Sequence, residues 1–303
     1  MKLGTRGSDL ALIQTQRVRS RLSDIGVESE YEIVKTSGDR FQDLDYSKIG
    51  GQGVFVRELD ALVVEGELDG AVHSMKDMPT ERPADLVVAA VPERAAAGDV
   101  LVTTDGKDID DLREGAVVGT SSLRRRAQLK RYRPDLEVKN LRGNVDTRVE
   151  KLREGEYDAI VLSGAGLERM DIDIPYERLN PDDFVPSANQ GVIAVVAMDG
   201  TDAFDALHKI DDPATRVTTT AERVIISRIG GGCVVPMGAF ARIEGENILI
   251  RTEVLSLDGS EEVKVERRVP VQDYYEEAKD IAEEMIEKGG KELVERTAEK
   301  VED

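Results

Sequence analysis

The sequence has very few of the residues that build disulfide-linked, metal-binding or aromatic-cored proteins. It contains one cysteine, two histidines and no tryptophan among 303 residues, and aromatic residues make up 4%. One cysteine excludes a disulfide within the chain, and these residues are too few for a Cys/His metal cluster, so we predict no metal site. The hydrophobic fraction of 40% with so few aromatics favours aliphatic α/β layers over an aromatic-rich β-sandwich.

Long apolar runs are also missing. No stretch reaches the length of a membrane span, and the segment that begins with Met1 has no apolar core like that of a signal peptide. We therefore expect a cytoplasmic protein without a membrane partner. The length exceeds that of a usual single domain and predicts two or three compact units.

Positive charge is scarce in the chain as a whole but concentrated in one segment. The net charge is −20, with 61 acidic and 41 basic residues, which argues against a nucleic-acid partner and suggests a surface adapted to concentrated salt in a halophilic organism. Residues 120–155, however, hold eleven basic residues against five acidic ones. This segment indicates an anionic ligand, although salt bridges on solvated helix faces would explain the same charges.

Alternating apolar segments and helical periods predict two α/β lobes followed by a region of a different pattern. Short strands and amphipathic helices alternate up to residue 163, and the apolar segment 192–198 is expected to return the chain to the first lobe. The last third predicts a helix over 213–228, an antiparallel sheet and a closing helix over 272–288. The expected domains are residues 1–95 with 190–212, residues 96–189, and residues 213–303.

Residues 72–79 (VHSMKDMP) continue a predicted strand into a polar loop. At the carboxyl edge of a parallel sheet, where catalytic groups gather, Asp77 beside the cation Lys76 offers a carboxylate that accepts a hydrogen bond and stabilises positive charge. The alternative is an aspartate that only caps a turn before proline.

Two further segments each predict a strand, a polar loop and a helix start. They are residues 119–126 (GTSSLRRR) and 141–148 (LRGNVDTR). Backbone N–H groups and hydroxyls at a helix N-terminus, followed by arginines, form an anion site. Arg6 and Ser8, after the first strand, are expected to face the same ligand.

Cys233 follows three glycines. A free cysteine is most often a small buried hydrophobic residue, but glycines allow another group to approach the backbone, which favours a modified or reactive thiol.

The chain resembles the hydroxymethylbilane synthase (porphobilinogen deaminase) family over nearly its whole length. The resemblance lies in the segments named above together with residues 4–11, 157–162, 165–169, 186–191 (PSANQG) and 231–236 (GGCVVP). It implies two doubly wound lobes like those of class II periplasmic binding proteins, plus a small α+β C-terminal domain with an antiparallel sheet that carries the cysteine. It also implies a monomer.

The resemblance further implies a chemistry. Cys233 would carry a dipyrromethane cofactor through a thioether, and four molecules of porphobilinogen would be added to it with loss of ammonia before hydrolysis releases the linear product. Asp77 and Lys76 would be catalytic and would contact the cofactor. The other implied cofactor contacts are Thr120, Ser121, Ser122, Arg124, Arg125, Arg142 and Gly143. The implied substrate contacts are Arg6, Ser8, Arg142, Arg148, Arg169 and Gln190.

One position departs from the family pattern. Gln52 stands where many members carry lysine, and Arg57 and Lys48 are the nearby cations that can replace it. A two-lobed protein that binds a carboxylate without transforming it, such as a sensor, remains the alternative function. A nucleotide-binding enzyme is disfavoured, because neither a Gly-x-Gly-x-x-Gly turn after the first strand nor a P-loop occurs.

Overall fold

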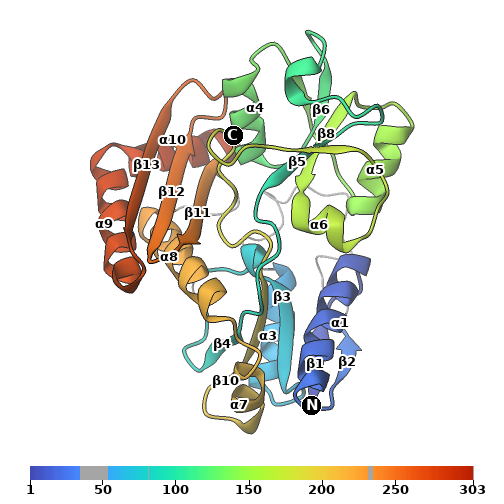
Figure 1. Cartoon of the computed structure of the whole chain (residues 1–303), viewed down its shortest axis with the longest axis vertical. Coiled ribbons are helices and arrows are strands. Elements are labelled where there is room, and N and C mark those ends of the chain that lie inside the picture. The colour runs from blue at the N-terminus through green and yellow to red at the C-terminus, as the bar shows by residue number, and fades with distance from the viewer. Residues whose placement is uncertain (35–53, 81, 231–234, 303) are drawn as a thin grey trace. The chain divides into compact units, whose positions relative to one another are not determined.

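The structure, a computed structural model, describes residues 1–34, 54–80, 82–230 and 235–302 (Figure 1). The chain divides into two compact units, each formed by two segments. The first unit is Met1–Ala95 with Gly191–Arg216, and the second is Ala96–Gln190 with Val217–Asp303. Each unit contains a five-stranded sheet, and the second also contains a three-stranded sheet.

The first unit is a sheet covered by helices on both faces. Its elements are β1 (Lys2–Thr5), α1 (Asp9–Asp24), β2 (Glu30–Ile33), α3 (Val54–Val64), β3 (Gly70–Ser74), the 3-10 helix η1 (Met75–Asp77), β4 (Leu86–Ala90), β10 (Ile193–Met198) and α7 (Asp202–His208). The strand order is β2-β1-β3-β10-β4, with β10 antiparallel to both of its neighbours. Leu59 of α3 packs on one face, and Leu22 of α1 and Leu207 of α7 pack on the other.

The five-stranded sheet of the second unit repeats this topology. Its elements are β5 (Asp99–Val102), η2 (Ile109–Asp111), β6 (Val117–Gly119), α4 (Leu123–Tyr132), β7 (Glu137–Lys139), α5 (Val145–Arg153), β8 (Ala159–Ser163), α6 (Gly164–Arg169) and β9 (Tyr176–Arg178). The order is β7-β6-β8-β5-β9, with β5 antiparallel to β8 and β9. Leu129 of α4 packs on one face, and Leu152 of α5 and Leu167 of α6 pack on the other. Central strands buried on both faces explain the apolar residues 159–162 of β8 and 70–72 of β3.

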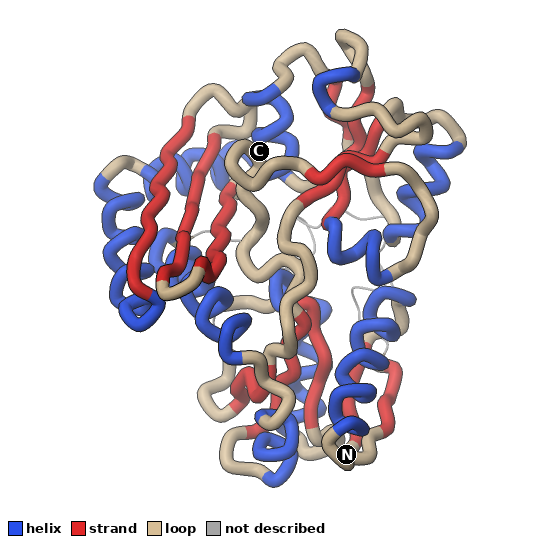
Figure 2. The backbone as a smooth tube through the Cα atoms, in the orientation of Figure 1, coloured by secondary structure: helices blue, strands red, loops and turns tan. Residues whose placement is uncertain are grey.

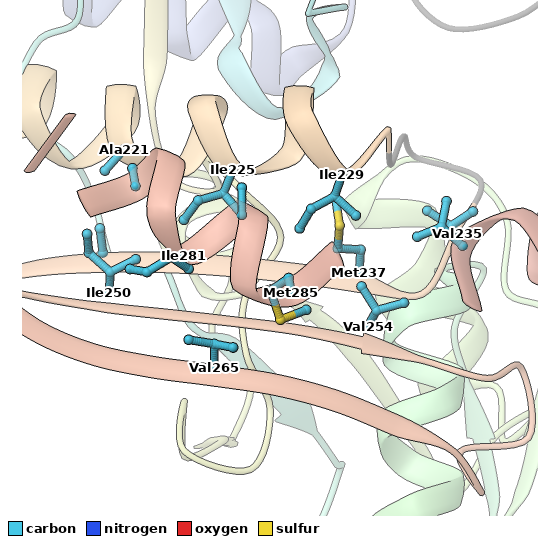
Figure 3. Packing of buried hydrophobic residues seen from close by; sticks show 14 of the residues in the cluster. Ala221, Ile225, Ile229, Val235, Met237, Ile250, Val254, Val265, Ile281 and Met285 are labelled. Carbon is cyan, nitrogen blue, oxygen red and sulfur yellow. The ribbon is translucent and has the colours of Figure 1, made fainter. Parts of the chain in front are cut away.

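The last third of the chain is an antiparallel sheet packed on helices. Its elements are α8 (Pro213–Ile229), β11 (Met237–Glu244), β12 (Asn247–Leu255), β13 (Glu262–Pro270), η3 (Val271–Asp273), α9 (Tyr274–Glu287) and α10 (Gly290–Glu302). Figure 2 shows the three strands side by side, in the order β11-β12-β13. In Figure 3 the side chains of Ile225 from α8 and Met285 from α9 lie against those of the strands, in one apolar cluster.

The predicted α/β class with an added antiparallel sheet is confirmed, and most differences concern short elements. Several of the strands expected up to residue 163 are only three or four residues long, as in β2 and β6. The helix expected over 272–288 is α9, whereas α10 was not predicted, although Leu293, Val294 and Ala298 recur at helical spacing and pack in the core. Gly289, at a φ of 89°, separates the two helices, because glycine adopts this left-handed conformation without strain.

Candidate functional site

In the first unit, two predicted site segments follow neighbouring parallel strands. β1 leads into Arg6 and Ser8, and β3 leads into Lys76 and Asp77. β1 pairs in parallel with β3, so the carboxyl ends of both strands meet at the same edge of the sheet. The structure therefore brings these four residues to one edge.

Local hydrogen bonds fix this edge. Ser8 is the N-cap of α1, and its hydroxyl accepts from the backbone N–H of Ala11 at 3.4 Å. Gln14 of α1 donates its amide to the Ser74 hydroxyl at 2.8 Å, and that hydroxyl lies 3.1 Å from the amide oxygen. The start of α1 and the end of β3 are thus tied together.

The turn that carries Lys76 and Asp77 is anchored by its flanking methionines. Met75 and Met78 are buried, and the N–H of Met75 donates to the carbonyl of Val192 at 3.0 Å. Lys76 is half-buried and Asp77 is exposed. The carboxylate is therefore presented to solvent from a turn whose backbone is held by the core.

Beneath this turn lies a buried ionic cluster that sequence reasoning missed. Asp60 of α3 lies 3.1 Å from the ring nitrogen Nε2 of His73, and Arg82 donates from Nε to the other carboxylate oxygen at 3.1 Å. The missed signal was a charged residue at a core position, because Asp60 shares the buried face of α3 with Val56, Leu59 and Val63. Burial alone would raise the pKa of Asp60, but the bonds and charges of His73 and Arg82 lower it.

The second unit places three helix starts along one sheet edge. β6 is parallel to both β7 and β8, and these three strands lead into α4, α5 and α6. Their N-termini therefore lie at the same carboxyl edge, where unpaired backbone N–H groups favour anions. This is the arrangement that the two predicted strand, loop and helix segments imply, with a third helix added.

Side-chain hydrogen bonds shape the loop before α4, and a glycine shapes the loop before α5. Thr120 is buried and accepts the N–H of Ser122 at 3.2 Å, whereas Ser121 is exposed. Ser122 is the N-cap of α4. Before α5, Gly143 has a φ of 111°, and a Cβ there would lie 2.8 Å from the Thr147 side chain, so only glycine fits.

Arg124 and Arg125 point into the core of the second unit. Arg124 donates from Nη1 to the carboxylate of Asp99 at 2.8 Å, and Arg125 donates to Asp99 from Nε at 3.0 Å and from Nη2 at 2.8 Å. Asp99 is 1% exposed. Burial would raise its pKa, but the two guanidinium charges hold that pKa well below its usual range. The prediction that these arginines bind the cofactor stays a prediction.

The remaining predicted residues are distributed around these groups. Gln190 is buried and donates its amide to Asp99 at 2.9 Å. Arg142 and Arg148 are half-buried, and Arg148 donates to the carbonyl of Gly143 at 2.7 Å. Arg169, the last residue of α6, is buried. Arg57 is exposed on α3, whereas Lys48, Gln52 and Cys233 lie outside the described residues.

Two classes of site have no counterpart in the described ranges. Within residues 1–34, 54–80, 82–230 and 235–302, no three His, Cys, Asp or Glu side chains gather as metal ligands would. In the same part of the chain, no helix combines the length and the apolar character needed to cross a membrane.

Two family models match the chain. Residues 1–206 match the model described as porphobilinogen deaminase, dipyromethane cofactor binding domain. Residues 216–287 match the model described as porphobilinogen deaminase, C-terminal domain. Together the two matches span almost all of the sequence.

Curated relatives are similar over the same extent. The probable porphobilinogen deaminase of Methanosarcina mazei is 49% identical, with 97% of this chain and 94% of the relative covered. The porphobilinogen deaminase of Sulfurimonas denitrificans is 41% identical, with 97% and 96% covered.

Solved structures with distant sequences match part of the chain at low TM-scores. The second substrate binding domain of a putative amino acid ABC transporter from Streptococcus pneumoniae has a TM-score of 0.45 at 15% identity, over 69% of this chain and 90% of that one. The periplasmic VFT2 domain of BvgS from Bordetella pertussis has a TM-score of 0.40 at 18% identity, over 75% and 92%.

Proposed function

Because the chain belongs to the porphobilinogen deaminase family, we propose that it is a hydroxymethylbilane synthase with a dipyrromethane cofactor. The reaction converts four molecules of porphobilinogen and one of water into hydroxymethylbilane and four of ammonia. The observation that carries the proposal is the gathering of Arg6, Ser8, Lys76 and Asp77 at one sheet edge in a member of this family.

Asp77 is proposed as the catalytic carboxylate. Each addition requires a pyrrole N–H to be held and positive charge to be stabilised as ammonia leaves the substrate. An exposed carboxylate on an anchored turn suits both tasks, since it accepts a hydrogen bond and offers negative charge at a fixed place. Lys76 beside it is proposed to bind a substrate carboxylate, as are Arg6 and Ser8.

The second unit has the donors that a dipyrromethane needs. Each pyrrole of this group carries an acetate and a propionate, so its site must supply cations and N–H donors. Three helix starts at one edge and the half-buried Arg142 and Arg148 meet this requirement. When bound, the group supplies the free pyrrole position to which substrate is added.

Its proposed contacts are Lys76, Asp77, Thr120, Ser121, Ser122, Arg124, Arg125, Arg142 and Gly143, with Cys233 as the covalent attachment. Arg148, Arg169 and Gln190 are proposed to contact the substrate. Of these, Arg124 and Arg125 have the least freedom, since their guanidinium groups already bind Asp99. Gln52 is uncharged, so we expect it to contact the cofactor or substrate more weakly than a lysine would at the same position.

The test combines intact mass with turnover of porphobilinogen. The purified wild-type protein should exceed its chain mass by one dipyrromethane and give the Ehrlich colour of pyrroles, whereas Cys233→Ser should have the mass of the chain alone. Asp77→Asn should retain the added mass but lose most release of ammonia. A carboxylate-binding sensor would carry no added mass and release no ammonia, and near-normal turnover by Asp77→Asn would remove the catalytic role.

Four further properties belong to the same proposal. We expect a monomer in the cytoplasm, without nucleic-acid partners, whose charge of −20 reflects a salt-rich environment. Full activity and stability in dilute buffer would contradict the salt-rich environment. The division into three domains, residues 1–95 with 190–212, 96–189 and 213–303, also stays a prediction.

A further inference from the structure

His73 in β3 and Arg82, which precedes β4, are both bound to one carboxylate. His73, the fourth residue of β3, contacts one oxygen of Asp60, and Arg82 contacts the other. Arg82 Nη2 lies 2.6 Å from the same oxygen as its Nε. Asp60 itself lies on α3, so a single helix side chain closes the base of the loop that holds Lys76 and Asp77.

This closure is buried and charged. The side chains of Asp60, His73 and Arg82 are at most 8% exposed. A carboxylate and a guanidinium that are both removed from water stay together, because separating them would leave an unpaired charge in the interior. The base of the loop is therefore held by an interaction that is costly to open.

The turn that carries Lys76 and Asp77 is anchored to the core on both sides. Met75 and Met78 belong to the apolar cluster on one face of the sheet, and the Met75 N–H donates to the carbonyl of Val192, the residue before β10. Between these anchors the chain turns once, and that turn presents Asp77.

We propose that Asp60 and Arg82 are positioning residues for the Lys76–Asp77 turn. They would act by fixing where the turn presents its carboxylate, without touching the substrate. This proposal rests on the proposed function, because it assumes that Asp77 is catalytic. A plain structural ion pair would lower stability when broken and leave the rate of the surviving folded enzyme unchanged.

The test compares Asp60→Asn with a matched control from the same unit. Asp211 is the control, since it is a part-buried carboxylate bonded by Arg216 at 2.7 Å and by the N–H of Val91 at 2.7 Å, and it has no bond to the loop. Both variants are prepared as holoenzyme, with cofactor content checked by mass. Melting temperature, kcat and KM for porphobilinogen are then measured at one pH.

We expect Asp60→Asn to lower kcat about tenfold to a hundredfold, the scale of a misplaced catalytic group, with KM within about threefold of the wild type. Asp211→Asn should lower the melting temperature but keep kcat within about threefold of the wild type. Equal kcat losses in the two variants, or a change in KM alone, would overturn the proposal.

Arg82→Gln is the second variant, for the case in which Asp60→Asn does not fold. It releases only the far end of the loop and leaves Asp60 with His73, so the buried charge keeps one partner. We expect a kcat loss of about tenfold, and unchanged kcat in folded Arg82→Gln would refute the positioning role. If the wild type itself makes no hydroxymethylbilane, it is the proposed function that fails. If the wild type turns over normally while the loop variants match it, only the positioning role fails.

Discussion

The two units each bury one aspartate against basic side chains, but the partners of the two aspartates differ. Asp60 in the first unit binds His73 and Arg82, neither of which was predicted to contact a ligand. Asp99 in the second unit binds Arg124 and Arg125, both of which were predicted to do so. Two arginines of the predicted anion motif therefore also hold the interior of their own unit.

The basic groups of the two clusters also differ. In the first unit one carboxylate faces one guanidinium and the imidazole of His73. In the second, one carboxylate faces two guanidinium groups, and Arg125 also donates to the carbonyl of Val161 and to the amide oxygen of Gln190. Arg124 and Arg125 bring two positive charges against the one negative charge of Asp99. Close to the N-terminus of α4, this excess would add to the attraction of that sheet edge for a carboxylate-rich ligand.

The largest expected effect follows from this imbalance. Asp99→Asn should lower the free energy of unfolding by about 3–5 kcal/mol, because two buried guanidinium groups lose their counterion. Asp60→Asn should cost less, since one guanidinium rather than two loses its counterion, along with the bond to His73. Urea unfolding of both variants at pH 7 measures the difference, and the reverse order would contradict the distinction between the clusters.

The sequence could predict the sheets and helix starts because these depend on local patterns. Apolar runs marked β3 and β8, and polar residues before a helical period marked the caps Ser8 and Ser122. α6, β9 and α7 were missed because they are short, and propensity summed over so few residues is weak.

The ionic clusters could not be predicted because their partners are far apart in the chain. Asp99 meets Arg124 only after β5 takes its place between β8 and β9, and no spacing rule encodes that contact. The motif showed that arginines follow a helix start, but not which of them turn inward. For Asp60 a signal existed, a carboxylate on an apolar helix face, but the sequence alone does not name its partners.

Acid titration should separate two buried carboxylates of the second unit. The pKa of Asp99 is lowered in the folded state, so its stabilising contribution is complete above its unfolded pKa of about 3.9 and is lost as the pH falls below it. Burial raises the pKa of Glu253 on β12, so its carboxylate costs stability as the pH rises above about 4.3. As the pH falls from 6 to 3, the difference in free energy of unfolding between wild type and Asp99→Asn should shrink. Over the same range, wild type should become more stable relative to Glu253→Gln. If urea unfolding shows that the two differences change in the same direction with pH, these opposite signs are contradicted.

The smallest effect is expected at Glu253 near neutral pH. Its carboxylate accepts from Arg131 at 3.0 Å and from the amide of Gln128, but Arg131 also binds Glu262 and the carbonyl of Asp183. Glu253→Gln therefore leaves the cation paired and removes the cost of an ionised group at 0% exposure. The free energy of unfolding should change by less than about 1 kcal/mol in either direction. A loss as large as that of Asp99→Asn would mean that α4 depends on Glu253 as much as on Asp99.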